Sequence, residues 1–120
     1  MKLEAGEQVL LQDKSARYIK GKLSIYPGTL VLTNQRLAFE QRSSIALAFG
    51  LLGMLILAPL LPGKVVVNLP PAKLAGFSRG KYGRNENVVN IATREGEEYR
   101  FLAQFDRWAS VLAQAGIAQG

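Results

Sequence analysis

The sequence predicts an α+β domain that is mainly β, with about seven antiparallel strands and one C-terminal helix. Apolar and polar residues alternate with a period of two through residues 29–41 and again through 88–102, and a short polar break interrupts each run. This pattern is typical of β-hairpins. From residue 105 the apolar spacing changes to that of a helix, with one face formed by Phe105, Trp108, Val111, Leu112 and Ala115. A chain of 120 residues supports one core, so we expect a single domain over residues 1–120.

The N-terminal third divides into strand-like stretches. QVLLQ (8–12) is a short apolar run, and ARYIKGKLSIY (16–26) alternates unevenly. We expect a turn at Pro27 and Gly28, because proline presets φ and glycine tolerates a positive φ. The polar break at residues 34–35 then marks the first hairpin turn.

The C-terminal half continues the β pattern before the helix. KVVVNL (64–69) and LAGFSRGKYG (74–83) are strand-like, and the second hairpin turns at residues 95–96. In the helix, Asp106 is expected to be the N-cap and Gly116 the residue just past the C-terminus.

An uncharged segment separates these two β regions. Ser43–Gly63 carries no charge over 21 residues and is rich in leucine, with Arg42 before it and Lys64 after it. We expect an apolar helical insert after the third strand. The prolines at 59 and 62 should stop the helix near Ala58, giving about 14 residues or about 21 Å. That is short of the roughly 30 Å of bilayer hydrocarbon.

Topology also argues against a membrane span. If the strands on both sides of the segment belong to one β structure, both ends of the segment lie on the same side of a bilayer. Two alternatives stay open: insertion into one leaflet, or burial in an interface between copies of the chain or against its own β structure. The residues expected to insert or to form the interface, with their flanking cations, are Ile45, Leu47, Phe49, Leu51, Leu52, Leu55, Ile56, Leu57, Leu60, Leu61, Arg42 and Lys64.

The middle of the chain is strongly basic. Eleven Lys or Arg residues and one acidic residue lie between Lys14 and Arg84, and the whole chain has a net charge of +6. Such an excess favours anionic partners, namely lipid headgroups or nucleic acid. Nucleic acid is the weaker alternative, because Tyr82 alone interleaves with the cations of SRGKYGR (78–84).

The residue types argue against catalysis. The chain has no Cys and no His, which removes thiolate and imidazole chemistry. Glu95, Glu97 and Glu98 cluster at an expected hairpin turn, where solvated charge is normal. We therefore expect no enzymatic activity, no metal and no cofactor. The charged N-terminal stretch does not resemble a signal peptide, and the lack of cysteine suits the cytoplasm.

Four stretches carry a resemblance to a known family: GEQVLL (6–11), GTLVLTNQRLAFEQ (28–41), VVNIATREGEEYRFL (88–102) and FDRWASVL (105–112). In this order they resemble the pleckstrin-homology superfold, and more closely its GRAM and bacterial PH-like branch. The resemblance implies two nearly orthogonal sheets that form a small open barrel, with the C-terminal helix plugging one end and Trp108 as its anchor. It also implies a headgroup site on the first strands, for which the matching candidates are Lys14, Arg17, Lys20 and Lys22. A second basic cluster comprises Arg79, Lys81 and Arg84.

Together these features predict a non-catalytic PH/GRAM-like module. We expect it to be cytoplasmic and to associate with the inner face of a membrane, with its basic surface and its apolar insert docking on anionic lipids. The alternative is a protein-interaction or homo-oligomerisation module in which the insert forms the interface.

Overall fold

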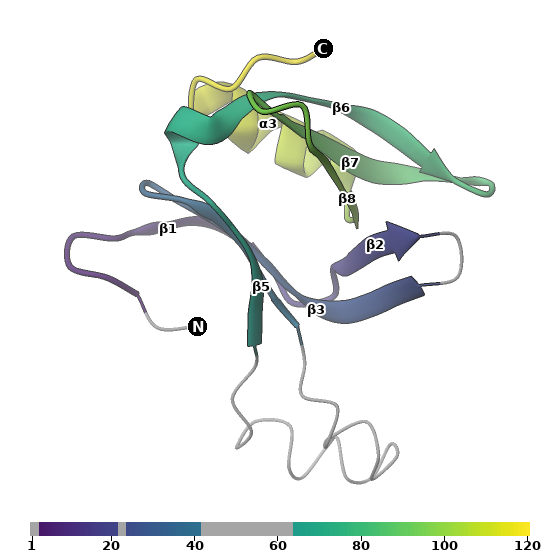
Figure 1. Cartoon of the computed structure of the whole chain (residues 1–120), viewed down its shortest axis with the longest axis horizontal. Helices are drawn as coiled ribbons and strands as arrows, with labels where there is room; N and C mark the ends of the chain where they lie inside the picture. Colours follow the sequence, from purple (N-terminus) through teal and green to yellow (C-terminus); the bar gives the residue numbers. More distant parts are fainter. Residues whose placement is uncertain (1–2, 22–23, 42–63) are drawn as a thin grey trace, which may run out of the picture.

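The computed structural model describes residues 3–21, 24–41 and 64–120. The described chain forms eight strands, one short 3-10 helix and one α-helix (Figure 1). In chain order they are β1 (Val9–Asp13), β2 (Arg17–Gly21), β3 (Ser24–Thr33), β4 (Leu37–Gln41), β5 (Lys64–Leu69), η1 (Pro71–Lys73), β6 (Leu74–Tyr82), β7 (Asn85–Thr93), β8 (Glu98–Leu102) and α3 (Phe105–Gln114).

All strand pairs are antiparallel, in the order β5-β4-β3-β2-β8-β7-β6, and β1 also pairs with β3. The terminal strands β5 and β6 do not pair with each other within the described chain, so the sheet is not closed. Figure 1 shows the sheet curving, with β6, β7 and β8 on one side and β1, β3 and β5 on the other. Helix α3 contacts β7, β6 and β1. The expected mainly β fold with a C-terminal helix is therefore confirmed.

The sheet bends within β3, where the sequence predicts a turn. Residues 24–27 pair with β2, whereas residues 28–32 pair with β4. A Cβ at Gly28 would overlap the carbonyl oxygen of Glu40 and lie 2.6 Å from the ring of Phe39. Glycine is therefore required for close approach at a strand corner rather than for a chain reversal, and the predicted turn at Pro27-Gly28 is wrong.

The division of residues 16–26 into strands differs from expectation. The stretch 16–26 is not one strand, because β2 ends at Gly21, β3 begins at Ser24, and these two residues pair. The uneven alternation of this stretch reflects that reversal. The uncharged segment consequently follows the fourth strand and not the third.

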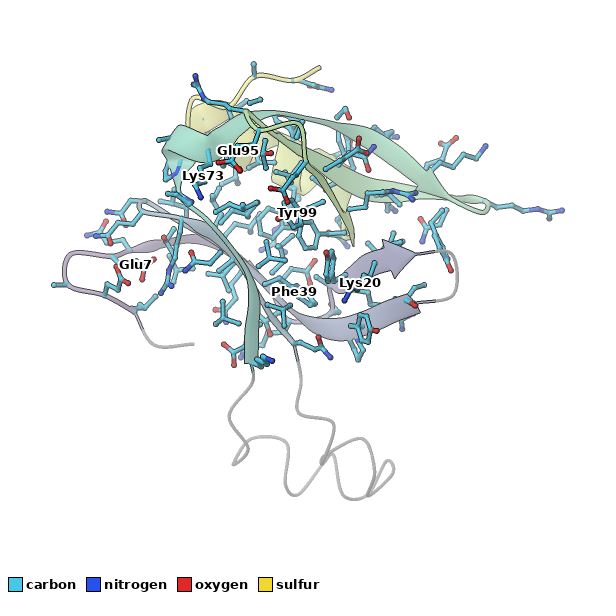
Figure 2. The ribbon with its side chains drawn as sticks, in the orientation of Figure 1. Glu7, Lys20, Phe39, Lys73, Glu95 and Tyr99 are labelled. Atoms are coloured by element: carbon cyan, nitrogen blue, oxygen red, sulfur yellow. The ribbon has the colours of Figure 1, made fainter. Side chains whose placement is uncertain are left out.

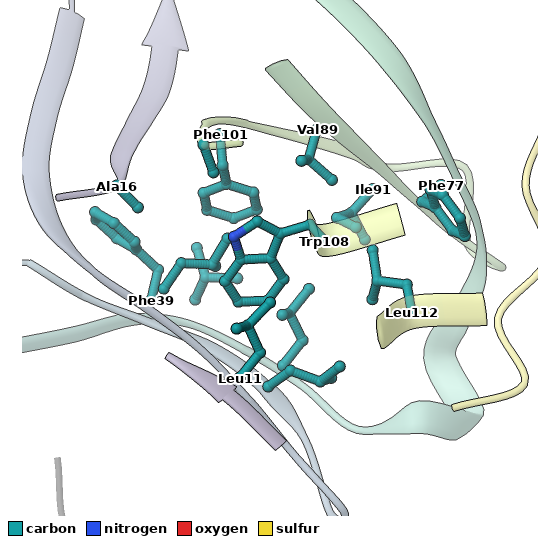
Figure 3. Packing of buried hydrophobic residues seen from close by; sticks show 14 of the residues in the cluster. Leu11, Ala16, Phe39, Phe77, Val89, Ile91, Phe101, Trp108 and Leu112 are labelled. Atoms are coloured by element: carbon teal, nitrogen blue, oxygen red, sulfur yellow. The ribbon is translucent and has the colours of Figure 1, made fainter. Parts of the chain in front are cut away.

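The core lies between the curved sheet and α3. Side chains from both halves of the curved sheet surround Trp108, which is 1% exposed (Figure 3). Among them are Leu11, Phe39 and Phe101. On α3 the fully or nearly fully buried residues are Phe105, Trp108 and Leu112, which follow the helical period.

The two ends of α3 differ in how well the sequence predicts them. The N-cap is Gln104, which makes no side-chain capping bond, and Asp106 lies in the first turn instead. At the other end Gly116 has a φ of +85°. The Gly116 N–H donates to the carbonyl of Ala113, and the Ile117 N–H donates to that of Leu112. This is a Schellman motif, so Gly116 is the helix stop and Asp106 is not the cap.

Candidate anion-binding site

The chain leaves and re-enters the sheet at one place around the uncharged segment. β4 ends at Gln41 and β5 begins at Lys64, and these two residues are direct partners in the antiparallel pair. The strands on both sides of residues 42–63 therefore belong to one sheet. The segment itself, with Arg42 and all ten expected insertion residues between Ile45 and Leu61, lies outside the described residues.

A polar cleft lies where three distant stretches of the chain meet. Its volume is about 310 Å³. The connection between β1 and β2, the start of β7, and the junction of β8 with α3 contribute its lining. The lining residues are Asp13, Ser15, Arg17, Asn85, Asn87, Leu102, Ala103, Gln104 and Arg107.

The β1–β2 connection is held in shape by local hydrogen bonds. Oδ1 of Asp13 accepts bonds from the Ser15 backbone N–H (2.9 Å) and from the Ser15 hydroxyl (3.0 Å). Buried Ala16 follows, and its carbonyl accepts a bond from the Gly28 N–H at the corner of β3. The chain therefore bends around Ala16, with Ser15 and Arg17 exposed on either side of it.

Pairing of β2 with β8 and of β8 with β7 brings the other walls together. Arg17 is the direct partner of Leu102 at the end of β8. The Ala103 N–H donates to the carbonyl of Asn87 (3.1 Å), and the Asn87 N–H donates to Oδ1 of Asn85 (2.9 Å). These bonds fix the β8–α3 junction against β7 and place Arg107 of α3 at the same cleft as Arg17.

The side chains of the two cleft arginines have no partner within the described chain. In residues 3–21, 24–41 and 64–120, neither the Arg17 nor the Arg107 guanidinium makes a hydrogen bond, an ion pair or a ring contact. The first turn of α3 adds positive partial charge beside them, because the N-cap residue Gln104 makes no side-chain hydrogen bond to the backbone N–H groups of that turn. The cleft therefore offers two guanidinium groups and a helix N-terminus to an anion.

Three of the other described arginines have side chains that are bound to the protein. Arg36 donates from Nε and Nη2 to the Glu7 carboxylate at 2.8 and 3.0 Å. Arg100 donates to the carbonyl of Lys81. Arg79 pairs with Asp106 at 2.8 Å and lies 4.5 Å from the centre of the Phe105 ring, so it joins β6 to α3.

The Glu7 carboxylate has a strongly lowered pKa. Its pKa is lowered to about 2, first because Arg36 donates hydrogen bonds to it and then because Thr33 and the Glu4 N–H do so. The hydrogen bonds between Arg36 and Glu7 also raise the pKa of Arg36. Asn34 also bonds to Gly6 and Gln8, so this cluster ties the N-terminal stretch to the β3–β4 turn.

The structure separates the two predicted basic clusters. Of the first, Arg17 lines the cleft, Lys14 lies in the β1–β2 connection, and Lys20 lies further along β2, at the opposite end of the sheet from Glu7 (Figure 2). Lys22 lies outside the described residues. Of the second, Arg79 is engaged with α3, Lys81 lies on β6, and Arg84 lies in the turn before Asn85.

Arg107 lines the cleft but is not among the site residues predicted from the sequence. It belongs to the helical stretch, and no local pattern links it to Arg17. The sequence places Asn85 and Asn87 in the polar turn RNEN (84–87), with no indication of a site. The signal that joins all four residues is strand register, which depends on contacts between distant parts of the chain.

Two further observations concern metals and membranes. Among the described residues, no three Asp, Glu, His or Cys side chains come together as a metal site. None of the helices in the described part of the chain has the length and apolar character needed to cross a bilayer.

Comparison with known proteins bears on the fold alone. No family model matches the sequence, and no curated protein matches it. Among solved structures, the chain is similar to the C-terminal domain of an unknown protein from Leishmania infantum, with 14% identity and a TM-score of 0.63. The match covers 92% of this chain and 86% of that one.

Proposed function

We propose that the protein is a non-catalytic PH/GRAM-like module that associates with an anionic membrane through its uncharged segment and its basic surface. The pairing of Gln41 with Lys64 carries the proposal. It brings both ends of a leucine-rich, charge-free stretch to one point of the sheet, so the stretch can enter one leaflet and return without crossing.

Basic residues lie at the end of the sheet where the uncharged segment begins and ends. Lys64 pairs with Gln41, Gln41 pairs with Gly28, and the Gly28 N–H donates to Ala16. Three interstrand steps of about 4.8 Å separate Lys64 from Ala16 by roughly 14 Å. Exposed Arg17 follows Ala16 directly, so one surface can present both cations and the apolar segment to the same membrane.

The magnitudes favour stable attachment. A leucine side chain moved from water into hydrocarbon contributes roughly 1.5–3 kcal/mol, and a Lys or Arg near an anionic leaflet contributes about 1 kcal/mol. Lys14, Arg17, Lys20 and Lys64 would supply the attraction. We leave Arg79 out of the membrane surface, since Asp106 and Phe105 already hold it.

The assignment to the PH-like superfold rests on order and topology. Four strands precede the uncharged segment, three antiparallel strands follow η1, and the helix comes last. The sheet is open and α3 packs against its curved face, and the resemblance implies an open barrel with the helix at one end. The GRAM branch rests on the sequence stretches alone.

Replacing the segment tests this function. In one variant, residues 42–63 become Asn-Gly, which joins Gln41 to Lys64 by a two-residue hairpin turn. We expect binding to vesicles that contain anionic lipid to fall to background, while circular dichroism and cooperative unfolding are retained. A control variant keeps Arg42 and replaces residues 43–63 by a Gly/Ser linker of equal length. Vesicle binding that is unchanged in both variants would refute the proposal.

One observation favours self-association as a second candidate. The outer edge of β6 is partly covered by the chain itself, since the Phe77 N–H donates to Ala118 and the Gly120 N–H donates to Phe77. The outer edge of β5 has no strand partner among the described residues, and its Val65 and Val66 are 36% and 38% exposed. A concentration-independent monomer in detergent-free buffer would exclude this candidate.

A further inference from the structure

We infer that the outer edge of β6 is a docking site for an acidic, extended segment of a partner protein, and that residues 117–120 of the chain itself close this edge when the partner is absent. Within the described chain β6 is a terminal strand of the sheet, so its outward backbone groups can pair with a further strand. The inference concerns a protein partner and does not depend on membrane attachment.

The chain already places a strand-like segment on this edge. After the Schellman motif at Gly116, the chain runs from the end of α3 to β6 (Figure 1), and Gln119 forms a parallel bridge with Phe77. The Phe77 N–H donates to the carbonyl of Ala118 (2.9 Å), and the Gly120 N–H donates to the carbonyl of Phe77 (2.7 Å). The edge therefore accepts backbone pairing at Phe77.

Gly76 accommodates this contact. A Cβ at Gly76 would lie 2.8 Å from the carbonyl oxygen of Ala118, and the heavy atoms within 4 Å of it in the described chain all belong to Ala118. Gly76 does not have a positive φ. The absence of a side chain here therefore serves the approach of residues 117–120 and not the conformation of β6.

The segment is held to β6 by few interactions. Within the described chain, the two hydrogen bonds at Phe77 are the backbone bonds that join residues 117–120 to β6. Ile117 is half-buried against the core, whereas residues 118–120 are exposed. Because a single backbone hydrogen bond contributes modestly to net stability, a competing strand can displace residues 118–120.

The next part of the edge is open. Phe77 pairs with Ile91 and Arg79 with Val89 in a regular part of the β6–β7 register. Residues two apart in an antiparallel strand direct their backbone groups to the same side. Because Phe77 directs its N–H and C=O outward, Arg79 does the same. Neither backbone group of Arg79 has a partner within the described chain, so an incoming strand can pair with both residues.

The charge beside this open part favours an acidic partner. Lys81 and Arg84 are exposed, and their side chains make no hydrogen bond or ion pair within the described residues. β6 contains no acidic residue. An acidic strand is therefore attracted, whereas pairing with β6 of a second copy would bring basic residues opposite basic residues. Positive charge at a sheet edge thus disfavours self-pairing and selects the partner.

Displacing residues 117–120 tests the inference. Gly76→Ala adds a methyl group that meets Ala118 and nothing else in the described chain, so it should open the edge and leave β6 paired with β7. The probe is a blocked hexapeptide of alternating glutamate and valine, titrated into the isotope-labelled full chain and followed by the backbone amide resonances. We expect Gly76→Ala to bind the probe about fivefold or more tightly than the unmodified protein, because losing two backbone bonds raises the population of the open edge.

A chain that ends at Ile117 opens the edge by a second route and should match Gly76→Ala. In the unmodified protein, saturating probe should make the Gly120 N–H exchange rapidly with solvent while the Phe77 N–H stays protected, because the probe replaces residues 118–120 on the same groups. Equal affinities in all three proteins, or binding that leaves the exchange of the Gly120 N–H unchanged, would overturn the inference.

Charge variants in the Gly76→Ala background test the acidic character of the partner. Lys81→Gln and Arg84→Gln should each weaken probe binding about two- to fivefold. Lys20→Gln is the matched control, because Lys20 is exposed on β2, three interstrand steps or roughly 14 Å from β6, and its affinity should be nearly unchanged.

Two further outcomes would refute an acidic protein partner. One is equal binding of the lysine–valine counterpart of the probe, or an equal loss in Lys20→Gln. The other is a gain in binding to anionic vesicles by Gly76→Ala with no gain in peptide binding, which would assign the edge to a membrane.

Discussion

Arg36 and Arg17 lie on the same sheet and have opposite surroundings. Arg36 is held by the Glu7 carboxylate, and the two side chains are 11% and 0% exposed. The Arg17 side chain is exposed and makes no hydrogen bond or ion pair within the described chain. A paired, half-buried arginine stabilises the fold and leaves nothing for a ligand, whereas an unpaired one in a polar cleft adds little stability and remains available. The comparison separates structural charge from charge that can bind.

The largest expected effect on stability is at the ion pair between Arg36 and Glu7. Arg36→Met leaves the Glu7 carboxylate buried without its main hydrogen-bond donor. We expect it to lower thermal stability more than Arg17→Gln, Arg79→Gln or Arg107→Gln does. Stability should partly recover in the double variant Glu7→Gln/Arg36→Met, where no uncompensated charge remains. Thermal and urea unfolding of the single and double variants and the unmodified protein measure both effects. A loss no greater than that of Arg17→Gln would remove the distinction between the two regions.

A pH dependence follows from the same pair. The folded pKa of Glu7 is about 2, below its ordinary value of 4.5, so the unfolded chain binds more protons between these values. Stability from Glu7 is therefore fully present above about pH 4.5 and is lost as the pH falls toward 2. We expect the urea midpoint to fall less steeply over this range in Glu7→Gln than in the unmodified protein. Parallel curves would contradict the assignment.

A smaller effect is expected where β6 meets α3. Arg79 is 43% and Asp106 92% exposed on their side chains, so solvent screens the ion pair and it contributes little. Arg79→Gln also removes the cation over Phe105 and should lower the free energy of unfolding by about 0.5–1 kcal/mol. Asp106→Asn should lower the free energy of unfolding by only a few tenths of a kcal/mol. Equal losses would mean that the ring contact contributes nothing.

The smallest effect on stability is expected in the cleft. Arg17→Gln and Arg107→Gln should each change the free energy of unfolding by less than about 0.5 kcal/mol, because no internal bond is lost. The same variants are expected to weaken ligand binding strongly. Urea unfolding in the absence of ligand checks the first statement, and a loss above about 1 kcal/mol would show that the cleft arginines are structural.

Local pattern predicted much of the fold and only part of the cleft. Alternation located the hairpins on either side of residues 34–35 and 95–96, and Gly116 ended α3 as expected. Pro27 and Gly28 misled, since a tight turn and a strand corner call for the same residue types. Their difference lies in Phe39 and Glu40, which approach Gly28 from the neighbouring strand.

The distinctive stretch TNQR (33–36) shows a second limit. It supports the family resemblance, yet its side chains bond to Gly6, Glu7 and Gln8 rather than to a ligand site. The cleft instead combines Arg17, which the family resemblance nominated, with Arg107, which no feature of the sequence singled out. Only the register of β2, β8 and β7 joins them.

The pairing of Gln41 with Lys64 also determines how freely the connection between β4 and β5 can change in length. The sheet fixes the two ends about 5 Å apart, and doubling a flexible connection between such ends changes the free energy of unfolding by only about 0.6 kcal/mol. The strands therefore set almost no thermodynamic limit on what is carried at this junction, and a foreign domain spliced in there should leave the stability of the sheet nearly unchanged.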